Sequence, residues 1–256
     1  MSAIDPAIDD LGLARLLAER TGEILREVRD DVGYGDRWEL MNAGDRAAQA
    51  YLSDALTAAR PDDAVLSEEA PDDLDRLDAD RVWIIDPVDG TSAYGHRGSH
   101  EWAVHIALWE RGSLAVGVVS RPAIGDIFDS VTAQQQPLRH PNEFRIVCSR
   151  SRTTPFVRSV AGDVGAQLVD MSSAGIKVLA VLTGEADAYL HTGGQHQWDN
   201  AAPVAVALGA GLRAERVDGS PIVYNERSTS IDDLLICRPE SYDKLRAAID
   251  ANAHRI

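Results

Sequence analysis

Residues 82–91, with the sequence VWIIDPVDGT, constrain the fold of this chain more than any other stretch. The apolar run at the start is bounded by turn signals and predicts an inner strand of a sheet. Two carboxylates, Asp86 and Asp89, stand three residues apart at the end of that run. Pro87 biases Asp86 toward an extended conformation, and Gly90 lets the backbone turn sharply or approach a ligand closely. The stretch therefore predicts a buried strand that ends in an acidic turn.

The residues that follow indicate what this turn could bind. Thr91 and Ser92 can open a helix or turn whose free N–H groups point outward. Hard oxygen ligands beside free amides make a place for a divalent cation and a phosphate. An acidic turn that merely ends a strand is the alternative interpretation of this segment taken alone.

The charge balance narrows the classes of partner. The chain has 256 residues and 45% hydrophobic content, enough for one large domain or two closely packed halves. With 41 Asp and Glu against 25 Lys and Arg, the net charge is −16, which repels polymeric nucleic acid and anionic membranes. A small anionic substrate would need bound cations or a local basic patch to offset this field.

Cysteine use and the N-terminal segment bear on the cellular compartment. Cys148 and Cys237 form no disulfide framework and no zinc-type spacing, so free thiols in a reducing cytosol are expected, although one disulfide between them stays open. The first ten residues are acidic and lack a basic, apolar leader, and no stretch approaches the length needed to span a membrane. We expect a soluble, cytoplasmic protein.

The first half of the chain, residues 1–133, is predicted to be α+β. Helical spacing of apolar residues predicts helices over residues 6–30 and 44–59, with a glycine-containing loop between them. Asp45 falls in the first turn of the second helix, where a capping or helix-dipole carboxylate would also stand. Residues 92–101 are predicted to be a polar and mobile flap. Further strands are expected at residues 64–67, 102–109, 114–120 and 126–131, the last three as an antiparallel meander.

The second half, residues 143–256, is predicted to be α/β because strands and helices alternate along it. Residues 132–142, with three glutamines in a row and two prolines, are the expected junction between the halves. Strands are predicted at residues 144–148, 167–171, 186–190 and 234–237, and helices at residues 173–182, 201–208 and 240–251.

Five carboxylates stand next to predicted strand ends or helix starts: Asp45, Glu68, Asp86, Asp89 and Asp199. If the core brings them together, they form a cluster of like charges that only cations can neutralise. Mg²⁺ prefers oxygen ligands of this kind and binds phosphate oxygens readily. Two such ions about 4 Å apart would activate a water and stabilise the leaving oxygen of an in-line displacement.

Two competing interpretations fit less well. Phosphotransferases of the haloacid dehalogenase type carry Asp-x-Asp-Gly-Thr, with the first aspartate as a covalent nucleophile. The spacing from Asp86 to Asp89 is one residue longer and spans Pro87, so we reject that mechanism and expect metal ligands on either side of a kink. A zinc site is disfavoured because glycines around His96 and His100 argue against the helix that would align them. The histidines at positions 105, 191 and 196 are likewise not expected to be zinc ligands.

Three motifs together resemble those of the inositol monophosphatase superfamily. Residues 86–91 (DPVDGT) are similar to its first signature, residues 198–202 (WDNAA) to its second, and residues 66–69 (LSEE) to its glutamate motif. Within the superfamily, residues 149–151 and 172–177 resemble the bacterial CysQ branch of 3'-phosphoadenosine 5'-phosphate phosphatases. The composition, rich in Ala, Arg and Asp, is similar to that of an actinobacterial member.

The resemblance implies a fold and an activity. The implied fold is the layered αβαβα sandwich of the inositol monophosphatase and fructose-1,6-bisphosphatase type, one domain in two halves. The implied activity is Mg²⁺-dependent removal of the 3'-phosphate of 3'-phosphoadenosine 5'-phosphate to give AMP, which clears a by-product of sulfate assimilation. An inositol monophosphatase, with fructose 1,6-bisphosphate as a side substrate, is the alternative enzyme. A non-catalytic binding module on the same fold is the alternative from another class. Lithium inhibition and a homodimer are also implied.

The resemblance also assigns roles to residues. Thr91, together with Glu68 or Asp45, would orient and deprotonate the attacking water. The N–H groups of Gly90 and Thr91 would hold the phosphate, and Lys177 would meet the second phosphate or the ribose, unless it is simply a solvated helix lysine. Two or three Mg²⁺ ions would be held by Glu68, Asp86, the carbonyl of Val88, Asp89 and Asp199. The implied substrate-binding set is Glu68, Val88, Asp89, Gly90, Thr91, Lys177 and Asp199.

The sequence departs from the family pattern near the expected leaving group. Ser92 stands where the family often has an acidic or amide residue, and Pro203 follows the two alanines of the second signature where glycine is usual. Asn42 replaces a frequent threonine before Asp45, which bears on a third metal ion there. These changes bear on the choice of substrate and leave the metal ligands in place.

Overall fold

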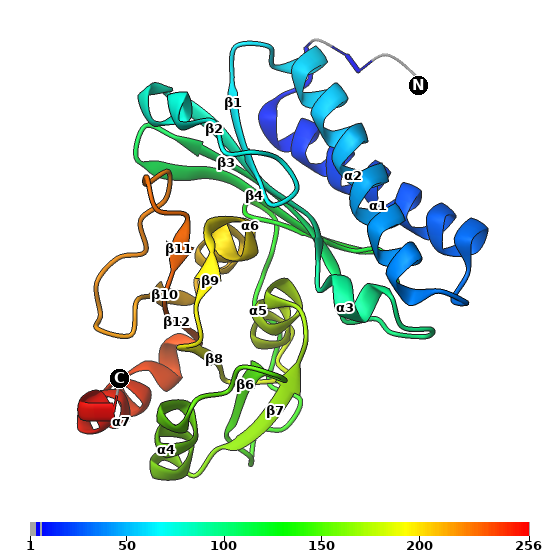
Figure 1. The fold of residues 1–256 in the computed structure, drawn as a ribbon. Coiled ribbons are helices and arrows are strands. Elements are labelled where there is room, and N and C mark those ends of the chain that lie inside the picture. Colours follow the sequence, from blue (N-terminus) through cyan, green and yellow to red (C-terminus); the bar gives the residue numbers. More distant parts are fainter. Residues whose placement is uncertain (1–3, 6, 256) are drawn as a thin grey trace.

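A computed structural model describes residues 4, 5 and 7–255. Its helices and strands stack in alternating layers, seen in Figure 1 from the blue helices at the upper right to the red C-terminal helix at the lower left. Among the described residues there are two five-stranded sheets and one two-stranded ribbon. The arrangement confirms the predicted layered αβαβα sandwich.

The first sheet carries the order β1-β2-β3-β4-β5 and contains the acidic stretch at its centre. β1 pairs with β2 in parallel, and the remaining neighbours are antiparallel, which confirms the predicted meander. The bounds are β1 (Ala64–Ser67), β2 (Arg81–Asp89), β3 (Ala103–Glu110), β4 (Ser113–Arg121) and β5 (Asp126–Asp129).

Helices cover both faces of this sheet. α1 (Asp10–Val32) and α2 (Arg37–Ala59) pack on one face, and α5 (Ala174–Leu182) and α6 (Gln197–Gly209) lie on the other. In β2, Trp83 and Ile85 face the α1 and α2 side, whereas Val82 and Ile84 face α5 and α6. Because both faces are buried, the strand is apolar without alternation, as an inner strand should be.

The second sheet has the order β10-β12-β8-β6-β7, with parallel pairing of β6 to both β7 and β8. One of its faces packs on α5, and α4 and α7 cover the other. The ribbon is formed by β9 (Gln195–His196) and β11 (Ser230–Ile231). The remaining bounds are α3 (Thr91–Tyr94), β6 (Arg145–Ser149), α4 (Pro155–Val164), β7 (Gln167–Met171), β8 (Ala188–His191), β10 (Arg213–Glu215), β12 (Leu234–Cys237), α7 (Tyr242–Asn252), and the 3₁₀ turns η1 (Leu74–Asp78), η2 (Pro239–Ser241) and η3 (Ala253–Arg255).

The start of the second helix was predicted wrongly. α2 begins at Arg37 rather than at residue 44, because Asp36 caps it by accepting hydrogen bonds from the amides of Trp38 (2.9 Å) and Glu39 (3.1 Å). Gly44 lies inside the helix, where a Cβ would come within 2.5 Å of the Tyr94 ring. Asp45 is therefore not in the first turn, and the interpretation of it as a cap is wrong.

Two other boundaries differ from prediction. The expected start of the first helix at residue 6 lies outside the described residues, and α1 begins at Asp10, capped by Asp9. α6 begins at Gln197 rather than at residue 201, so Asp199 belongs to its first turn. No described helix has the length and apolar character that crossing a membrane would require.

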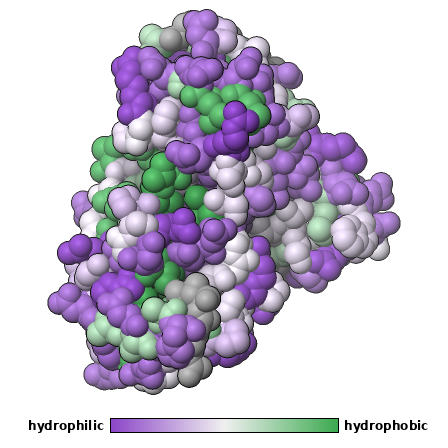
Figure 2. Space-filling view, turned by 60° about the vertical axis from the view of Figure 1, so that its left-hand side comes forward, coloured by the Kyte–Doolittle hydropathy of each residue, from purple (hydrophilic) through white to green (hydrophobic). Residues whose placement is uncertain are grey.

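The two sheets share one interior. α5 and α6 lie between them, and the apolar cluster around these helices takes Val82 and Ile84 from the first sheet and Val147 and Tyr189 from the second. The predicted junction crosses between the halves, where the Gln136 amide donates to the Leu182 carbonyl (2.8 Å). We propose that both halves form one domain. Figure 2 shows that hydrophilic side chains cover most of one outer face, with apolar side chains gathered along its left side.

Candidate metal centre and phosphate pocket

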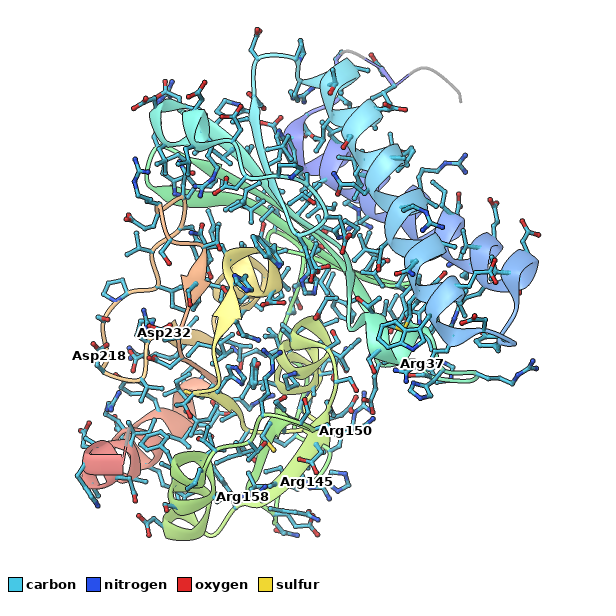
Figure 3. All side chains as sticks on the ribbon, viewed as in Figure 1. Arg37, Arg145, Arg150, Arg158, Asp218 and Asp232 are labelled. Carbon is cyan, nitrogen blue, oxygen red and sulfur yellow. The ribbon has the colours of Figure 1, made fainter. Side chains whose placement is uncertain are left out.

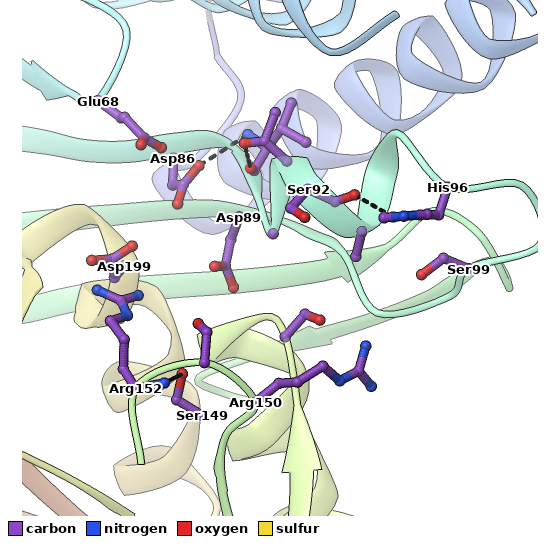
Figure 4. A pocket seen from close by; sticks show the side chains of 16 residues that line it. Glu68, Asp86, Asp89, Ser92, His96, Ser99, Ser149, Arg150, Arg152 and Asp199 are labelled. Atoms are coloured by element: carbon purple, nitrogen blue, oxygen red, sulfur yellow. Dashed lines mark hydrogen bonds between the residues drawn. The ribbon is translucent and has the colours of Figure 1, made fainter. Parts of the chain in front are cut away.

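Four of the five predicted carboxylates, all but Asp45, meet at one edge of the first sheet. Glu68 directly follows β1, and parallel pairing of Ser67 with Ile85 places it beside Asp86 in β2. Asp199 arrives from the first turn of α6, where its Oδ2 accepts a hydrogen bond from the His196 amide (2.6 Å). Together these residues border a pocket of about 540 Å³ (Figure 4). Its wall consists of Glu68, Asp86, Val88–Ala93, His96, Ser99, Ser149–Arg152, Ser172 and Asp199.

A bulge in β2 turns Asp86 and Asp89 toward the same place. Asp86 pairs with His105 and Asp89 pairs with Ala103, so three steps along β2 match two steps along β3. One extra residue is therefore inserted at Pro87 and Val88. Residues three apart in a regular strand face opposite sides, and the bulge removes this difference. Proline is tolerated there because it has no N–H to lose from the ladder. The predicted kink at Pro87 is confirmed.

The oxygen atoms of the cluster are arranged for a cation. Ligand atoms of Asp86, Asp89 and Asp199 lie within 4.8 Å of one another, and among the described residues this is the one group of acidic, His or Cys side chains that could hold a metal ion. It includes no histidine, so the structure gives no support for zinc. Asp86 is fully buried, and its Oδ2 has no hydrogen-bond partner within the described chain. A buried carboxylate oxygen without a partner is costly, so the site fits a divalent cation.

Mutual repulsion shows in the pKa values of these carboxylates. Burial raises the pKa of Glu68 to about 7, with further contributions from Asp199 and Glu69. Burial and the charge of Glu68 also hold the pKa of Asp86 well above its usual range. Hard carboxylate oxygens, together with the Val88 carbonyl in the same wall, are the donor set that Mg²⁺ prefers. The residues present therefore fit the predicted cofactor.

Asp89 is held differently, by three groups that sequence reasoning did not identify as partners. Its Oδ2 accepts hydrogen bonds from the Ser173 hydroxyl and the Gly175 amide (2.8 Å). His105 Nε2 lies 3.2 Å from the same oxygen, although its orientation does not make a hydrogen bond. Burial alone would raise the pKa of Asp89, but His105, Lys177 and the Ser173 hydroxyl outweigh it and lower the pKa to about 2. Asp89 is therefore ionised and held in a fixed orientation.

Gly175 makes this arrangement possible. A Cβ at that position would come within 2.2 Å of His105 Nε2, so any larger residue would push the imidazole away from Asp89. The sequence indicates a role for residues 172–177 only through the family resemblance, and it offers His105 only as a zinc candidate. The signal that could have found His105 is its pairing with Asp86, which follows from the meander once the register is known.

Lys177 is not the solvated helix lysine considered from the sequence. It is 2% exposed, its Nζ donates to the Ser172 carbonyl (3.1 Å), and the ammonium lies 5.2 Å from the centre of the Tyr189 ring. Burial lowers the pKa of Lys177 to about 8, against the opposing effect of Asp89. It lies behind the pocket wall rather than in it, and its contact with the substrate stays a prediction.

Thr91 and Gly90 both lie in the pocket wall, at the turn predicted to bind phosphate. Thr91 is the first residue of α3, and its hydroxyl donates to the Val88 carbonyl (3.0 Å). Gly90 has a φ of 85°, and a Cβ there would come within 2.8 Å of the Glu101 carbonyl. The amides of Ala93 and Tyr94 donate to the Gly90 carbonyl, which leaves the earlier amides of the first turn for a ligand.

Asp45 and the predicted flap lie around this centre. Burial and the charge of Glu69 raise the pKa of Asp45 to about 7, but Asp45 is not part of the pocket wall, so its catalytic role stays a prediction. The first part of the flap is fixed by hydrogen bonds, because the buried Arg29 donates to the carbonyls of Tyr94 (3.1 Å) and His96 (2.8 Å). Its predicted mobility is not tested by the structure.

Magnesium is expected to stabilise this fold more at high pH than at low pH. Glu68 and Asp45 have folded-state pKa values raised to about 7, from 4.5 and 3.8. The folded protein therefore keeps protons that the unfolded chain releases, and stability contributed by these groups falls as pH rises from about 4 to about 7. A bound cation replaces the lost protons, so Tm should rise by several degrees with millimolar MgCl₂ near pH 8, and by about 1 °C near pH 5. Thermal unfolding with MgCl₂ or EDTA at both pH values measures this, and an equal rise at both would contradict it.

Comparison with known proteins agrees with this geometry. A sequence model of the inositol monophosphatase family matches residues 11–252. A 3'-phosphoadenosine 5'-phosphate phosphatase of Mycobacterium tuberculosis is 46% identical over 236 residues, which cover 89% of this chain and 88% of the relative. The 3'(2'),5'-bisphosphate nucleotidase CysQ of Escherichia coli is 28% identical over 232 residues, 84% of this chain and 94% of that protein. The solved structure of CysQ from Bacteroides thetaiotaomicron, a bacterial member of the inositol monophosphatase family, superposes with a TM-score of 0.77 at 25% identity, covering 88% of this chain and 96% of that one.

Proposed function

The chain belongs to the inositol monophosphatase family, and we propose that it hydrolyses the 3'-phosphate of 3'-phosphoadenosine 5'-phosphate to give AMP and phosphate. The observation that carries the proposal is a single pocket with buried carboxylates on one wall and Arg150 and Arg152 on the other. The mycobacterial relatives, 44–46% identical and named for this activity, support the same substrate over an inositol phosphate. A non-catalytic module would have no need of a buried carboxylate cluster.

We propose Mg²⁺ as the cation, in two or three copies held by Glu68, Asp86, Asp89, Asp199 and the carbonyl of Val88. When bound, Mg²⁺ would neutralise these carboxylates and polarise the reacting phosphate. The chain's own groups then do the positioning. Amides of the first turn of α3 bind phosphate oxygens, and the Thr91 hydroxyl, which donates to the Val88 carbonyl, can accept a hydrogen bond from the attacking water. Glu68, or Asp45 from further away, is the proposed acceptor of the proton from that water.

A substrate panel on the purified protein tests this function. With MgCl₂, phosphate release from 3'-phosphoadenosine 5'-phosphate should exceed that from inositol 1-phosphate and fructose 1,6-bisphosphate by about 100-fold or more in kcat/KM, since the site would be built for a nucleotide. EDTA should abolish release, and lithium should inhibit it. A preference for inositol 1-phosphate would overturn the proposal in favour of the alternative enzyme. Homodimer formation and a cytoplasmic location stay predictions.

A further inference from the structure

The pocket wall opposite the carboxylates is a short loop that carries two arginines. Residues 149–154, with the sequence SRSRTT, connect the end of β6 to the start of α4, and Arg150 and Arg152 line the pocket. In a chain of net charge −16, two cations facing one cavity are unusual enough to require an account. Their hydrogen bonds show that one arginine is paired with a carboxylate and the other is not.

Arg150 is already neutralised. Its guanidinium donates to Glu101 Oε1 (2.9 Å), and the other oxygen of Glu101 accepts from the Ser172 amide (3.0 Å). The Arg150 side chain is 58% exposed and, in Figure 4, extends away from the carboxylates. This ion pair joins the loop after β6 to the loop after α3, so the charge of Arg150 has little left for a ligand.

Arg152, in contrast, has no carboxylate partner among the described residues. Its guanidinium donates to a neutral partner, the Gly194 carbonyl (3.0 Å), and no carboxylate of the described chain lies within 4.0 Å of it. A guanidinium has five N–H donors, so this one bond leaves most of them available. Figure 4 shows the Arg152 side chain extending from the loop toward Asp199 and the interior of the pocket. It is close enough to Lys177 to lower the pKa of that ammonium further.

The backbone that carries Arg152 is fixed before any ligand binds. The Arg152 amide donates to Ser149 Oγ (3.3 Å), and the Thr153 hydroxyl donates to the Ser149 carbonyl (2.5 Å). The hydroxyls of Thr154 and Thr192 are hydrogen-bonded at 2.6 Å, which joins this loop to the segment that leads into α6. The backbone at Arg152 is therefore held in place before binding, and a fixed donor loses less entropy on binding.

We propose that Arg152 binds a second, non-reacting phosphate of the substrate and so selects bisphosphorylated over monophosphorylated compounds. The inference rests on the proposed function and assigns its specificity to one side chain. A phosphate held at the metal centre is neutralised by the cations, but a second phosphate on the same molecule would be repelled by the surrounding acidic surface. An unpaired guanidinium across the pocket removes that repulsion and offers paired donors that match phosphate oxygens. The hydroxyls of Ser149, Ser151 and Ser172 line the same wall and can complete the subsite.

The test compares two substrates that differ only in the second phosphate, 3'-phosphoadenosine 5'-phosphate and adenosine 3'-monophosphate. Arg152→Ala should lower kcat/KM for the bisphosphate by about 10- to 100-fold, mainly through KM, because a charge-assisted hydrogen bond to a non-reacting group contributes uniform binding. Turnover of the monophosphate should stay within about twofold of wild type. Arg152→Lys keeps the charge but not the paired donors. Its kcat/KM for the bisphosphate should therefore lie between the values of wild type and Arg152→Ala.

A matched control comes from the neighbouring helix. Arg158 lies on α4 (Figure 3) and is not among the residues of the pocket wall, and its side chain donates no hydrogen bond to the described residues. Arg158→Ala removes the same unit of charge and should leave both substrates unaffected. Equal losses on both substrates in Arg152→Ala, or no loss on either, would overturn the assignment of Arg152. Failure of the wild-type protein to hydrolyse either nucleotide would instead overturn the proposed function, and this inference with it.

Discussion

Replacement of Asp89 by asparagine is expected to reduce kcat by about 1,000-fold or more while the protein stays folded. Cations at such a centre supply several kcal/mol of transition-state stabilisation, and each 1.36 kcal/mol corresponds to a factor of ten in rate. Asp89 is one of the three clustered carboxylates, and it is the one whose pKa the surrounding residues lower. Its removal should therefore abolish metal binding rather than only weaken it.

The hydrogen bonds around Asp89 explain why asparagine is the sharpest substitution. Ser173 and Gly175 both donate to Oδ2, so an asparagine side chain would turn its own oxygen toward these donors. The amide nitrogen would then take the place of Oδ1 and face the cation. An NH₂ group has no lone pair for a metal ion, so Asp89→Asn should preserve the internal hydrogen bonds and remove the ligand.

The measurement combines phosphate release with the thermal stabilisation produced by MgCl₂. Asp89→Asn should show neither, and its apo Tm should lie somewhat below that of wild type, because the lowered pKa of Asp89 means that its ionised form stabilises the fold at neutral pH. Asp80→Asn is the control, because this substitution removes the same charge at a different place. Asp80 is exposed, pairs with Arg111 (3.0 Å) and is not part of the pocket wall. Retained activity in Asp89→Asn would rule out Asp89 as an essential ligand.

Most of the strands and the acidic residues that form the cluster could be predicted because they depend on local patterns, whereas the layered αβαβα arrangement was expected from the family resemblance. Val82–Asp89 is apolar on both faces and then abruptly acidic, which is enough to place an inner strand and a site at its end. The meander follows from short strands separated by turn residues. The start of α2 could not be placed, because Gly33, Gly35 and Gly44 are all turn signals in sequence, and only the contact of Gly44 with Tyr94 shows that it belongs inside a helix.

The residues that support the site could not be predicted because their contacts are distant in sequence. Ser173 meets Asp89 across 84 positions, and nothing near either residue indicates the pairing. Lys177 illustrates the same limit, since a lysine on a helix is ordinarily exposed, and its burial depends on the packing of α5 between two sheets. Likewise, the difference between Arg150 and Arg152 depends on Glu101, which lies about 50 residues earlier in the chain.

Replacement of Thr91 by valine is expected to lower kcat by about 100- to 1,000-fold with little change in KM or in metal binding. The Thr91 hydroxyl donates to the Val88 carbonyl, which fixes the orientation of its lone pairs. Valine has the same shape, so α3 should be unchanged, but it offers no acceptor for the attacking water. The loss should therefore appear in the chemical step rather than in substrate binding.

Two further readouts separate this role from a purely structural one. Thr91→Ser keeps the hydroxyl and should recover most of the activity, whereas a role in packing alone would require the methyl group that serine lacks. The rise in Tm caused by MgCl₂ should be the same in Thr91→Val as in wild type, because the carboxylates and the Val88 carbonyl remain. Loss of that rise would show that Thr91 holds the cation, and full activity in Thr91→Val would show that the water is oriented by Glu68 or Asp45 without it.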